Sequence, residues 1–165
     1  MNEPATDRDL FARLAELGIE THTVEHEPVF TVEEAKRVRG EEGGTHIKNL
    51  LLRNKKGAMW LVVVEENRRV DLKALAARLG VKNLSFASAD RLMRYLGVIP
   101  GAVTPFGVIN DRERAVEVVL DANIFERDPI HGHPLRNDRT TAIAGADLLR
   151  FLRATGHEPA VIDLD

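Results

Sequence analysis

Apolar residues recur at helical spacing in several parts of the chain, and most of these repeats are bounded by residues that start or stop helices. Thr31 and Glu34 form a capping box, and Asp71 and Ser88 are N-cap residues ahead of later repeats. The predicted helices cover residues 7–17, 31–38, 72–79, 89–95 and 146–154, and glycines 18, 80, 97 and 156 end four of them.

Runs of β-branched and aliphatic residues predict the strands. Residues 47–53 and 58–64 flank a turn at 54–57 and predict a β-hairpin. A second hairpin is predicted for residues 106–109 and 115–120, and single strands for 20–25, 140–143 and 160–162. Because strands and helices alternate but two connections are hairpins, the predicted fold class is α/β: a mixed sheet with hairpins, flanked by helices.

Length and composition narrow the class of protein. A chain of 165 residues with 44% hydrophobic and 30% charged residues predicts a single globular domain over residues 1–165. The absence of cysteine excludes thiol nucleophiles, zinc–thiolate sites, iron–sulfur clusters and disulfides. No basic region leads into an apolar run at the N-terminus, and apolar stretches such as 61–64 are too short for a bilayer. A cytoplasmic protein with no membrane partner is expected.

Charge is distributed unevenly. Residues 36–82 contain twelve Lys or Arg and five acidic residues, a net charge of +7, so the remainder carries −10 of the total of −3. Such polarity can direct a polyanion to one side of a globule. The alternative is a set of solvated helix faces with no partner.

Several enzyme classes lack their motifs. The only serines, Ser85 and Ser88, are not in a G-x-S-x-G turn, and neither a phosphate-binding loop nor a dinucleotide fingerprint is present. His131-Gly-His133 could give two imidazole ligands to a metal, although no companion motif accompanies the pair. Ordinary loop histidines, one with a catalytic role, are the other interpretation.

Two segments could carry chemistry without a side-chain nucleophile. Residues 100–107 contain two prolines and two glycines, which fix an unusual backbone path and could present N–H groups to a small ligand. Lys48 and Asn49 precede Leu50-Leu51-Leu52 on a predicted strand, so Lys48 could extend into a cleft as a fixed positive charge. A structural loop and an edge-strand lysine that prevents aggregation are the alternatives.

Taken in order, the motifs resemble the trans-editing aminoacyl-tRNA deacylases related to YbaK and to the insertion domain of bacterial prolyl-tRNA synthetase. Within them, the chain is most similar to the free-standing alanyl-tRNA(Pro) deacylases of the ProXp-ala type. The resemblance rests on HEPVFTVEEA (26–35), GTHIKNL (44–50), LSFAS (84–88), GVIPGAVTPF (97–106), ND (110–111), VLDA (119–122) and HPL (133–135).

The resemblance implies hydrolysis, without metal or other cofactor, of the ester between a mischarged amino acid and the tRNA 3′ end. Its motif positions fall on Lys48, Gly101, Pro105 and His133, with Asn49 typical of the alanine-specific subgroup. We hypothesise that Lys48 holds the terminal phosphate or the substrate carbonyl, that Asn49 orients the substrate, and that His133 positions the ribose or water. Amides around Gly101 would stabilise the oxyanion.

Specificity follows from size, because a site for proline cannot strongly exclude the smaller alanine, whereas a second, smaller site excludes proline. We predict that this small site is formed by Val29, Phe30, Gly101, Ala102 and Pro105. The expected partner is the acceptor stem of tRNA(Pro) carrying alanine, and a complex with prolyl-tRNA synthetase is left open. Candidate tRNA contacts are Lys55, Lys56, Arg68, Arg69, Lys73, Arg78 and Lys82. The alternatives are a non-catalytic tRNA-binding module and a metal-dependent hydrolase that uses His131 and His133.

Overall fold

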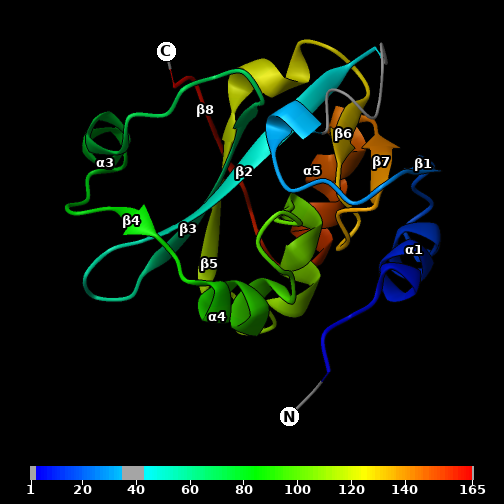
Figure 1. Cartoon of the computed structure of the whole chain (residues 1–165), viewed down its shortest axis with the longest axis horizontal. Coiled ribbons are helices and arrows are strands. Elements are labelled where there is room, and N and C mark those ends of the chain that lie inside the picture. The colour runs from blue at the N-terminus through cyan, green and yellow to red at the C-terminus, as the bar shows by residue number, and fades with distance from the viewer. Residues whose placement is uncertain (1–2, 35–42, 165) are drawn as a thin grey trace.

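The computed structural model describes residues 3–34 and 43–164, and in these residues eight strands form one mixed sheet. The order across the sheet is β1-β7-β6-β2-β3-β5-β8, and β4 pairs with the end of β2 (Figure 1). The strands are β1 (Thr21–Glu25), β2 (Thr45–Arg53), β3 (Met59–Glu65), β4 (Ser85–Phe86), β5 (Val116–Asp121), β6 (Ile130–Gly132), β7 (Arg139–Ile143) and β8 (Ala160–Ile162). The predicted fold class is confirmed.

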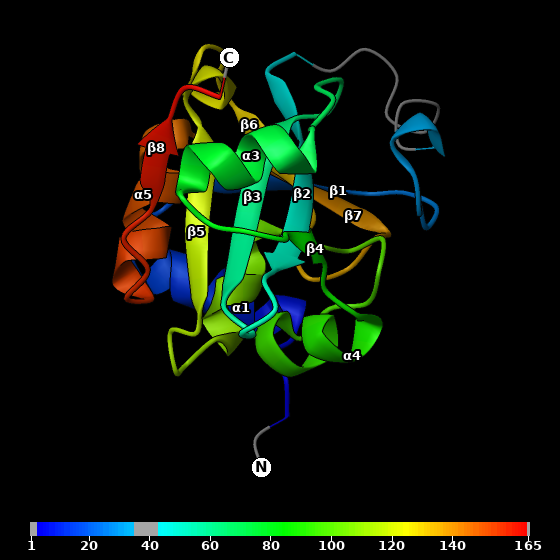
Figure 2. The same cartoon turned by 90° about the vertical axis from the view of Figure 1, so that its left-hand side faces the viewer.

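Helices cover both faces of the sheet (Figure 2). They are α1 (Asp7–Glu16), α3 (Leu72–Leu79), α4 (Ala89–Arg91), α5 (Gly145–Ala154), the π-helix η1 (Leu92–Leu96) and the 3₁₀ helices η2 (Pro105–Asn110) and η3 (Ala122–Phe125). The larger core joins one sheet face to α1, α5 and η2, with Phe106 and Phe151 packed edge to face. The smaller core joins the other face to α3 through Leu75.

The predicted helix boundaries hold where capping residues set them. Asp71 accepts from the backbone amides of Lys73 and Ala74, and Gly80 ends α3 in the left-handed conformation. Ser88 caps α4, which continues as η1 to Gly97. The Oγ1 of Thr31 accepts from the Glu34 amide, but the Glu34 carboxylate bonds the Phe30 amide instead of the Thr31 amide. The predicted end of this helix, Val38, lies outside the described residues.

The first predicted hairpin is confirmed and the second is wrong. Strands β2 and β3 pair antiparallel, with Lys48 opposite Val64 and Asn49 opposite Val63. Residues 106–109 belong to η2, which Thr104 caps and Pro105 begins, so they do not form a strand. Strand β5 therefore has no hairpin partner before it and runs parallel to both β3 and β8.

Strand β6 was not predicted, because it has only three residues, the last a glycine, and so short a run gives no periodic signal. It pairs parallel with the start of β2, where His46 lies opposite His131, and antiparallel with β7. This short strand leaves most of one edge of β2 without a partner, between β6 and β4. Within residues 3–34 and 43–164, no helix has the length and apolar character needed to cross a membrane.

Candidate functional site

Strand β2 places Lys48 and Asn49 on opposite faces of the sheet. Side chains alternate along a strand, and Val63, opposite Asn49, belongs to the larger core, whereas Val64, opposite Lys48, belongs to the smaller core beside α3. The Asn49 Nδ2 donates to the carbonyl of Val103 at 3.0 Å. The Lys48 ammonium donates to the carbonyl of Arg68. The strand thus joins two surfaces with different chemistry.

The segment that accepts the Asn49 bond is a tight turn with free amides. The Ala102 amide donates to the Ile99 carbonyl at 3.0 Å, and Gly101 has a φ of +93°, as a Pro-Gly type II turn requires. Among the described residues, the amides of Gly101, Val103 and Thr104 donate no hydrogen bond. Fixed N–H groups of this kind can stabilise a developing oxyanion.

His133 follows β6 and has a defined tautomer. Its Nδ1 lies 2.8 Å from the Arg139 carbonyl, and a carbonyl only accepts, so Nδ1 carries the hydrogen and Nε2 keeps its lone pair. Burial lowers the pKa of His133 below its ordinary value, and the neighbouring His26 lowers this pKa further. At neutral pH, His133 is therefore an uncharged acceptor.

His26 lies beside His133 and is held from three directions. The two ring centroids are 6.3 Å apart. The Nδ1 of His26 donates to the Glu27 carbonyl at 2.7 Å, its Nε2 lies 2.8 Å from the Thr140 hydroxyl, and its backbone amide donates to the Asp138 carbonyl. This segment continues to Val29, whose backbone amide and carbonyl both bond Asn137.

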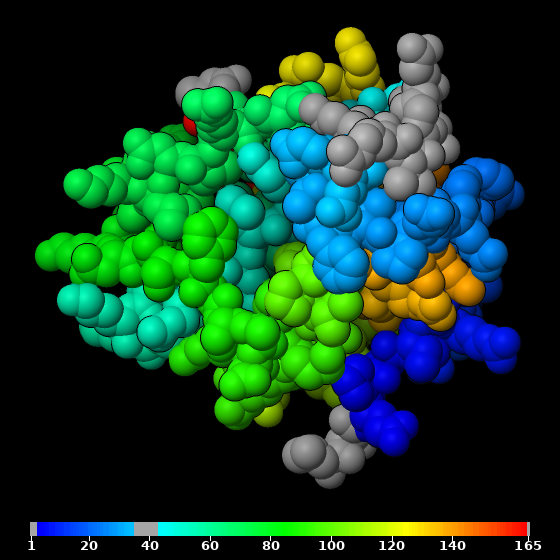
Figure 3. Space-filling model, viewed as in Figure 1, coloured from blue at the N-terminus to red at the C-terminus, as the bar shows by residue number. Residues whose placement is uncertain are grey.

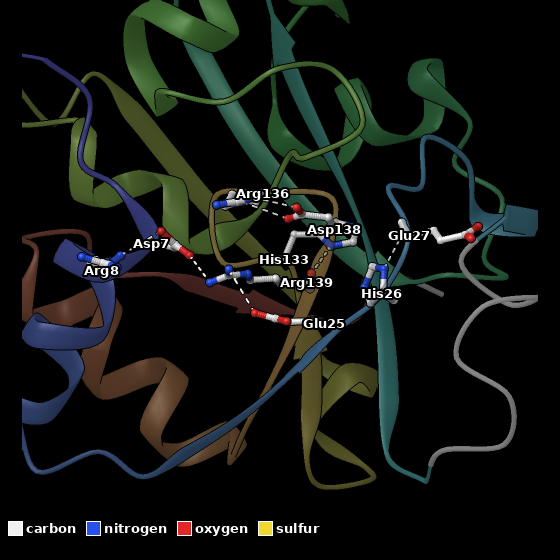
Figure 4. A network of polar contacts seen from close by, with 9 residues as sticks. All are labelled: Asp7, Arg8, Glu25, His26, Glu27, His133, Arg136, Asp138 and Arg139. Atoms are coloured by element: carbon white, nitrogen blue, oxygen red, sulfur yellow. Dashed lines mark hydrogen bonds and ion pairs between the residues drawn. The ribbon is translucent and has the colours of Figure 1, made fainter.

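A network of ion pairs lies beside the two histidines (Figure 4). Arg139, whose carbonyl holds His133, pairs with Asp7 of α1 at 2.6 Å and with Glu25 of β1 at 3.1 Å. Arg136 and Asp138 form a bidentate pair in the adjacent loop, and Arg136 holds the pKa of Asp138 below its ordinary value. The network fixes the backbone that orients His133 and His26.

A small cavity of about 50 Å³ opens between these elements, with space for a few water molecules. Its polar lining comes mostly from β2, β6 and the segment before residue 30. The lining residues are His26, His46, Ile47, Asn49, Glu66, His131, Gly132, His133 and Thr140. Asn49 Oδ1 is buried there and accepts no hydrogen bond from any described residue. The imidazoles of His46 and His131 stack with centroids 4.1 Å apart.

The structure brings together Asn49, His133 and the Gly101 turn, but not the ammonium of Lys48. The Lys48 ammonium donates to the Arg68 carbonyl on the other face, and its role toward the substrate stays a prediction. Neighbouring residues on a strand point to opposite faces, so Lys48 and Asn49 cannot both face the Gly101 turn.

The five residues predicted to form the small site, Val29, Phe30, Gly101, Ala102 and Pro105, do not line this cavity, and their role stays a prediction. Val29, Ala102 and Pro105 are buried as support behind it. Phe30 is 60% exposed, and Gly101 packs against it. The lining residues His26, Ile47, Gly132 and Thr140 were missed, although His26 opens one quoted motif.

The seven predicted tRNA contacts lie on the hairpin turn, on α3 and beside α3, the side that faces the viewer in Figure 2. All are exposed except Arg68, which is half-buried, donates to the Leu164 carbonyl and pairs with Asp121 at 3.5 Å. Arg68, Arg69 and Arg78 line a cavity of about 430 Å³ next to α3. The described residues contain no group of three or more His, Asp or Glu arranged to hold a metal ion.

Comparison with known proteins defines the class. The model of the aminoacyl-tRNA editing domain family matches residues 26–151. The prolyl-tRNA editing protein ProX of Acetoanaerobium sticklandii is 41% identical, over 94% of this chain and 95% of its own. The prolyl-tRNA synthetase associated domain-containing protein 1 of Danio rerio is 41% identical over 96% of this chain and 87% of its own.

More distant relatives share the same architecture. The multifunctional Ser/Thr-tRNA deacylase ProXp-y of Escherichia coli K12 is 28% identical over 88% of this chain and 87% of its own. A solved structure of a candidate trans-editing enzyme for prolyl-tRNA synthetase superposes with a TM-score of 0.72 at 22% identity, over 94% of each chain.

The fold and the matched family define a tRNA-editing hydrolase. The chain belongs to the aminoacyl-tRNA editing domain family. The predicted class of enzyme, an aminoacyl-tRNA deacylase, is confirmed at this level.

Proposed function

We propose that this protein hydrolyses alanine from mischarged tRNA(Pro). The observation that carries this proposal is a small cavity lined by Asn49 and by the acceptor His133, next to the free amides of the Gly101 turn that Asn49 bonds. The similarity to ProX, a prolyl-tRNA editing protein, supports the tRNA identity. As a proofreading factor for translation, the protein would act in the cytoplasm, with prolyl-tRNA synthetase as a candidate partner.

The chemistry requires no covalent intermediate. Water adds to the acyl carbon, the bond from that carbon to the ribose oxygen breaks, and the proton lost by water ends on the ribose oxygen. We assign oxyanion stabilisation to the free amides of Gly101 and Val103. His133 Nε2 would accept a hydrogen bond from the attacking water or from the neighbouring ribose hydroxyl, which can serve as the base. An activated ester needs little more than this placement.

Alanine is favoured by the size of the cavity. Space for a few water molecules accommodates a methyl group, whereas the pyrrolidine ring of proline would overlap the walls. Ile47 is the only aliphatic side chain in the lining and would contact the methyl group. The proposal keeps the exclusion by size that the sequence suggested and assigns it to the lining of this cavity.

The basic side of the molecule would bind the tRNA backbone. Lys48 lies on this side with the seven candidate contacts, and we assign it a terminal phosphate instead of the substrate carbonyl. Exchange of its bond to the Arg68 carbonyl for a bond to phosphate would strengthen the interaction, because both groups are then charged. Contacts of this kind weaken with added salt.

Serine is a second candidate acyl group. The cavity is lined by four histidines, Thr140 and Asn49 together with Glu66, and a hydroxymethyl group could bond these polar groups. A relative is named as a Ser/Thr-tRNA deacylase. Serine is only one atom larger than alanine, so size alone separates the two weakly.

The test is deacylation of four substrates by the purified protein: alanyl- and prolyl-tRNA(Pro), seryl-tRNA and threonyl-tRNA. We expect alanyl-tRNA(Pro) to be hydrolysed at least about 100-fold faster than prolyl-tRNA(Pro). Equal rates on these two would refute exclusion by size. Binding without turnover would select the non-catalytic module, and turnover abolished by EDTA and restored by a divalent metal would select the metal-dependent hydrolase.

A further inference from the structure

Phe30 is a large aromatic side chain held in solvent beside the site. Its side chain is 60% exposed, although the chain has only six phenylalanines and most of the others are buried or partly buried. Exposure gives up the favourable free energy that burial of such a side chain provides. An exposed aromatic residue at the edge of a site is a candidate recognition surface.

The backbone around Phe30 is fixed, so the ring is a positioned surface. Its amide donates to Glu34 Oε2 at 2.9 Å, and the preceding Val29 is held by both its amide and its carbonyl to Asn137. Val29 is buried, and the chain turns Phe30 outward. The ring also packs on the free-amide turn: a Cβ added to Gly101 would lie 3.0 Å from Phe30 Cδ1.

The substrate must place an aromatic group close to this position. In aminoacyl-tRNA the ester and the terminal base are attached to the same ribose, so an ester at the free amides of Gly101 and Val103 brings its base within a few ångströms of the turn. Among the Phe, Tyr and Trp side chains of the described residues, only those of Phe30 and Phe86 are exposed, and Phe30 is the one that lies against Gly101. Figure 3 shows the segment around residues 25–32 raised beside the yellow-green segment near residue 100, with β2 recessed next to them.

Charge complementarity points to the same occupant. The net charge of +7 over residues 36–82 attracts a phosphate backbone, and proteins that bind single-stranded nucleic acid combine such a surface with aromatic platforms for the bases. We propose that Phe30 stacks on the 3′-terminal base of the tRNA. This inference rests on the proposed function, because it takes the ester to be bound at the Gly101 turn.

A thermodynamic cycle tests the stacking. The dissociation constants of uncharged tRNA(Pro) and of the same tRNA lacking its 3′-terminal adenosine are measured for the wild type and Phe30→Ala. Base stacking corresponds to about 5- to 100-fold in affinity. We expect removal of the adenosine to weaken wild-type binding by this factor more than it weakens Phe30→Ala binding.

Two variants make the cycle specific. Phe86→Ala removes a side chain of nearly equal exposure, 62%, on β4, and should keep the wild-type sensitivity to the adenosine. Phe30→Trp should retain the sensitivity, whereas Phe30→Leu should lose it. The proposal is overturned if Phe30→Ala stays as sensitive as the wild type, if it weakens both tRNAs equally, or if Phe30→Leu behaves as the wild type.

The cycle is independent of the proposed chemistry. Uncharged tRNA carries no ester, so these measurements report on stacking even if wild-type protein fails to deacylate alanyl-tRNA(Pro), the result that would refute the proposed function. Because Phe30 is mostly exposed, its variants should unfold at the wild-type temperature. A lowered unfolding temperature, together with an equal loss of affinity for both tRNAs, would overturn the stacking role.

Discussion

In the proposed function, the two faces of strand β2 have different roles. On one face, Asn49 bonds the Gly101 turn and lines a small polar cavity. On the other face, Lys48 lies with α3 and a set of exposed cations that have few fixed partners. Selection of an acyl group needs a rigid small space, whereas attraction of a polyanion needs mobile charge of one sign.

The strongest way to break the rigid face is Gly101→Ala. The φ of +93° costs a non-glycine residue roughly 1–2 kcal/mol, and the new Cβ would lie 3.0 Å from the Phe30 ring. Displacement of the free amides should lower the single-turnover deacylation rate by about 100-fold or more. Gly80→Ala is the matched control, since Gly80 has a φ of +72° but open space around it. Equal loss of rate in both variants would contradict a role specific to Gly101.

The pH dependence of the deacylation rate tests the role of His133 on the same face. Because burial lowers its pKa, the neutral form is complete above the ordinary pKa and is lost as pH falls through the lowered value. The single-turnover rate should therefore rise with pH to a plateau near neutrality. His133→Asn should lower the plateau by about 100-fold and abolish this dependence. A variant that keeps the wild-type pH profile would assign the titration to another group.

Asn49→Ala should separate turnover from binding. Loss of the bond from Nδ2 leaves the Val103 carbonyl without its partner and loosens the turn. We expect the deacylation rate to fall by about 10- to 30-fold while the dissociation constant for uncharged tRNA stays within about twofold of the wild type. A loss of affinity for uncharged tRNA as large as the loss of deacylation rate would argue against separate roles for the two faces.

Lys48→Ala should give the converse result. Loss of one phosphate contact should weaken tRNA binding by about tenfold at low salt and reduce the slope of log affinity against log salt by about one unit. At saturating tRNA, most of the rate should remain. Lys73→Ala, which removes a cation from the exposed surface of α3, is the variant with which Lys48→Ala is compared. A rate loss at saturation that exceeds that of Asn49→Ala would return Lys48 to the reacting centre.

The smallest effect on activity is expected at a buried pair far from both faces. His157 Nε2 lies 2.8 Å from Asp111 Oδ2, and the carboxylate also accepts from the amides of Ala115 and Val116. Burial raises the pKa of Asp111, but these bonds outweigh it, and the pKa lies below its ordinary value.

Asp111 therefore contributes stability that is complete above the ordinary pKa of 3.8 and is lost as pH falls through the lowered one. Asp111→Asn should lower the free energy of unfolding in urea at pH 7 by about 2–3 kcal/mol. The deacylation rate of the folded protein should be unchanged. Asp138→Asn, at a more exposed ion pair, should cost less than about 1 kcal/mol.

Local signals in the sequence predicted much of the fold. Asp71, Ser88 and Gly80 marked helix ends correctly because a cap acts within one turn of the chain. The Phe106–Ile109 run was misread because Thr104 and Pro105 start a 3₁₀ helix, a local cue that outweighs β-branched composition. Strand β6 depends on pairing with β2 and β7, which no short window reveals.

For the candidate site, the sequence indicated residues but not their arrangement. Family motifs pointed to Asn49, Gly101 and His133, which the fold brings to one region. They could not say that Lys48 faces away from Asn49, although strand alternation already implied it. His26 and Thr140 were missed because their mutual bond joins residues 114 positions apart.

The contacts that the N-terminal residues make with the rest of the fold have a practical consequence. The family match begins at residue 26, yet Leu10 and Leu14 are in the larger core and Asp7 anchors the arginine behind His133. A fragment limited to residues 26–151 would lack α1, which packs on the larger core. It would also lack β1, which pairs with β7. The core and the sheet thus extend beyond the region that the family model matches, and we expect a stable protein to need residues on the N-terminal side of residue 26.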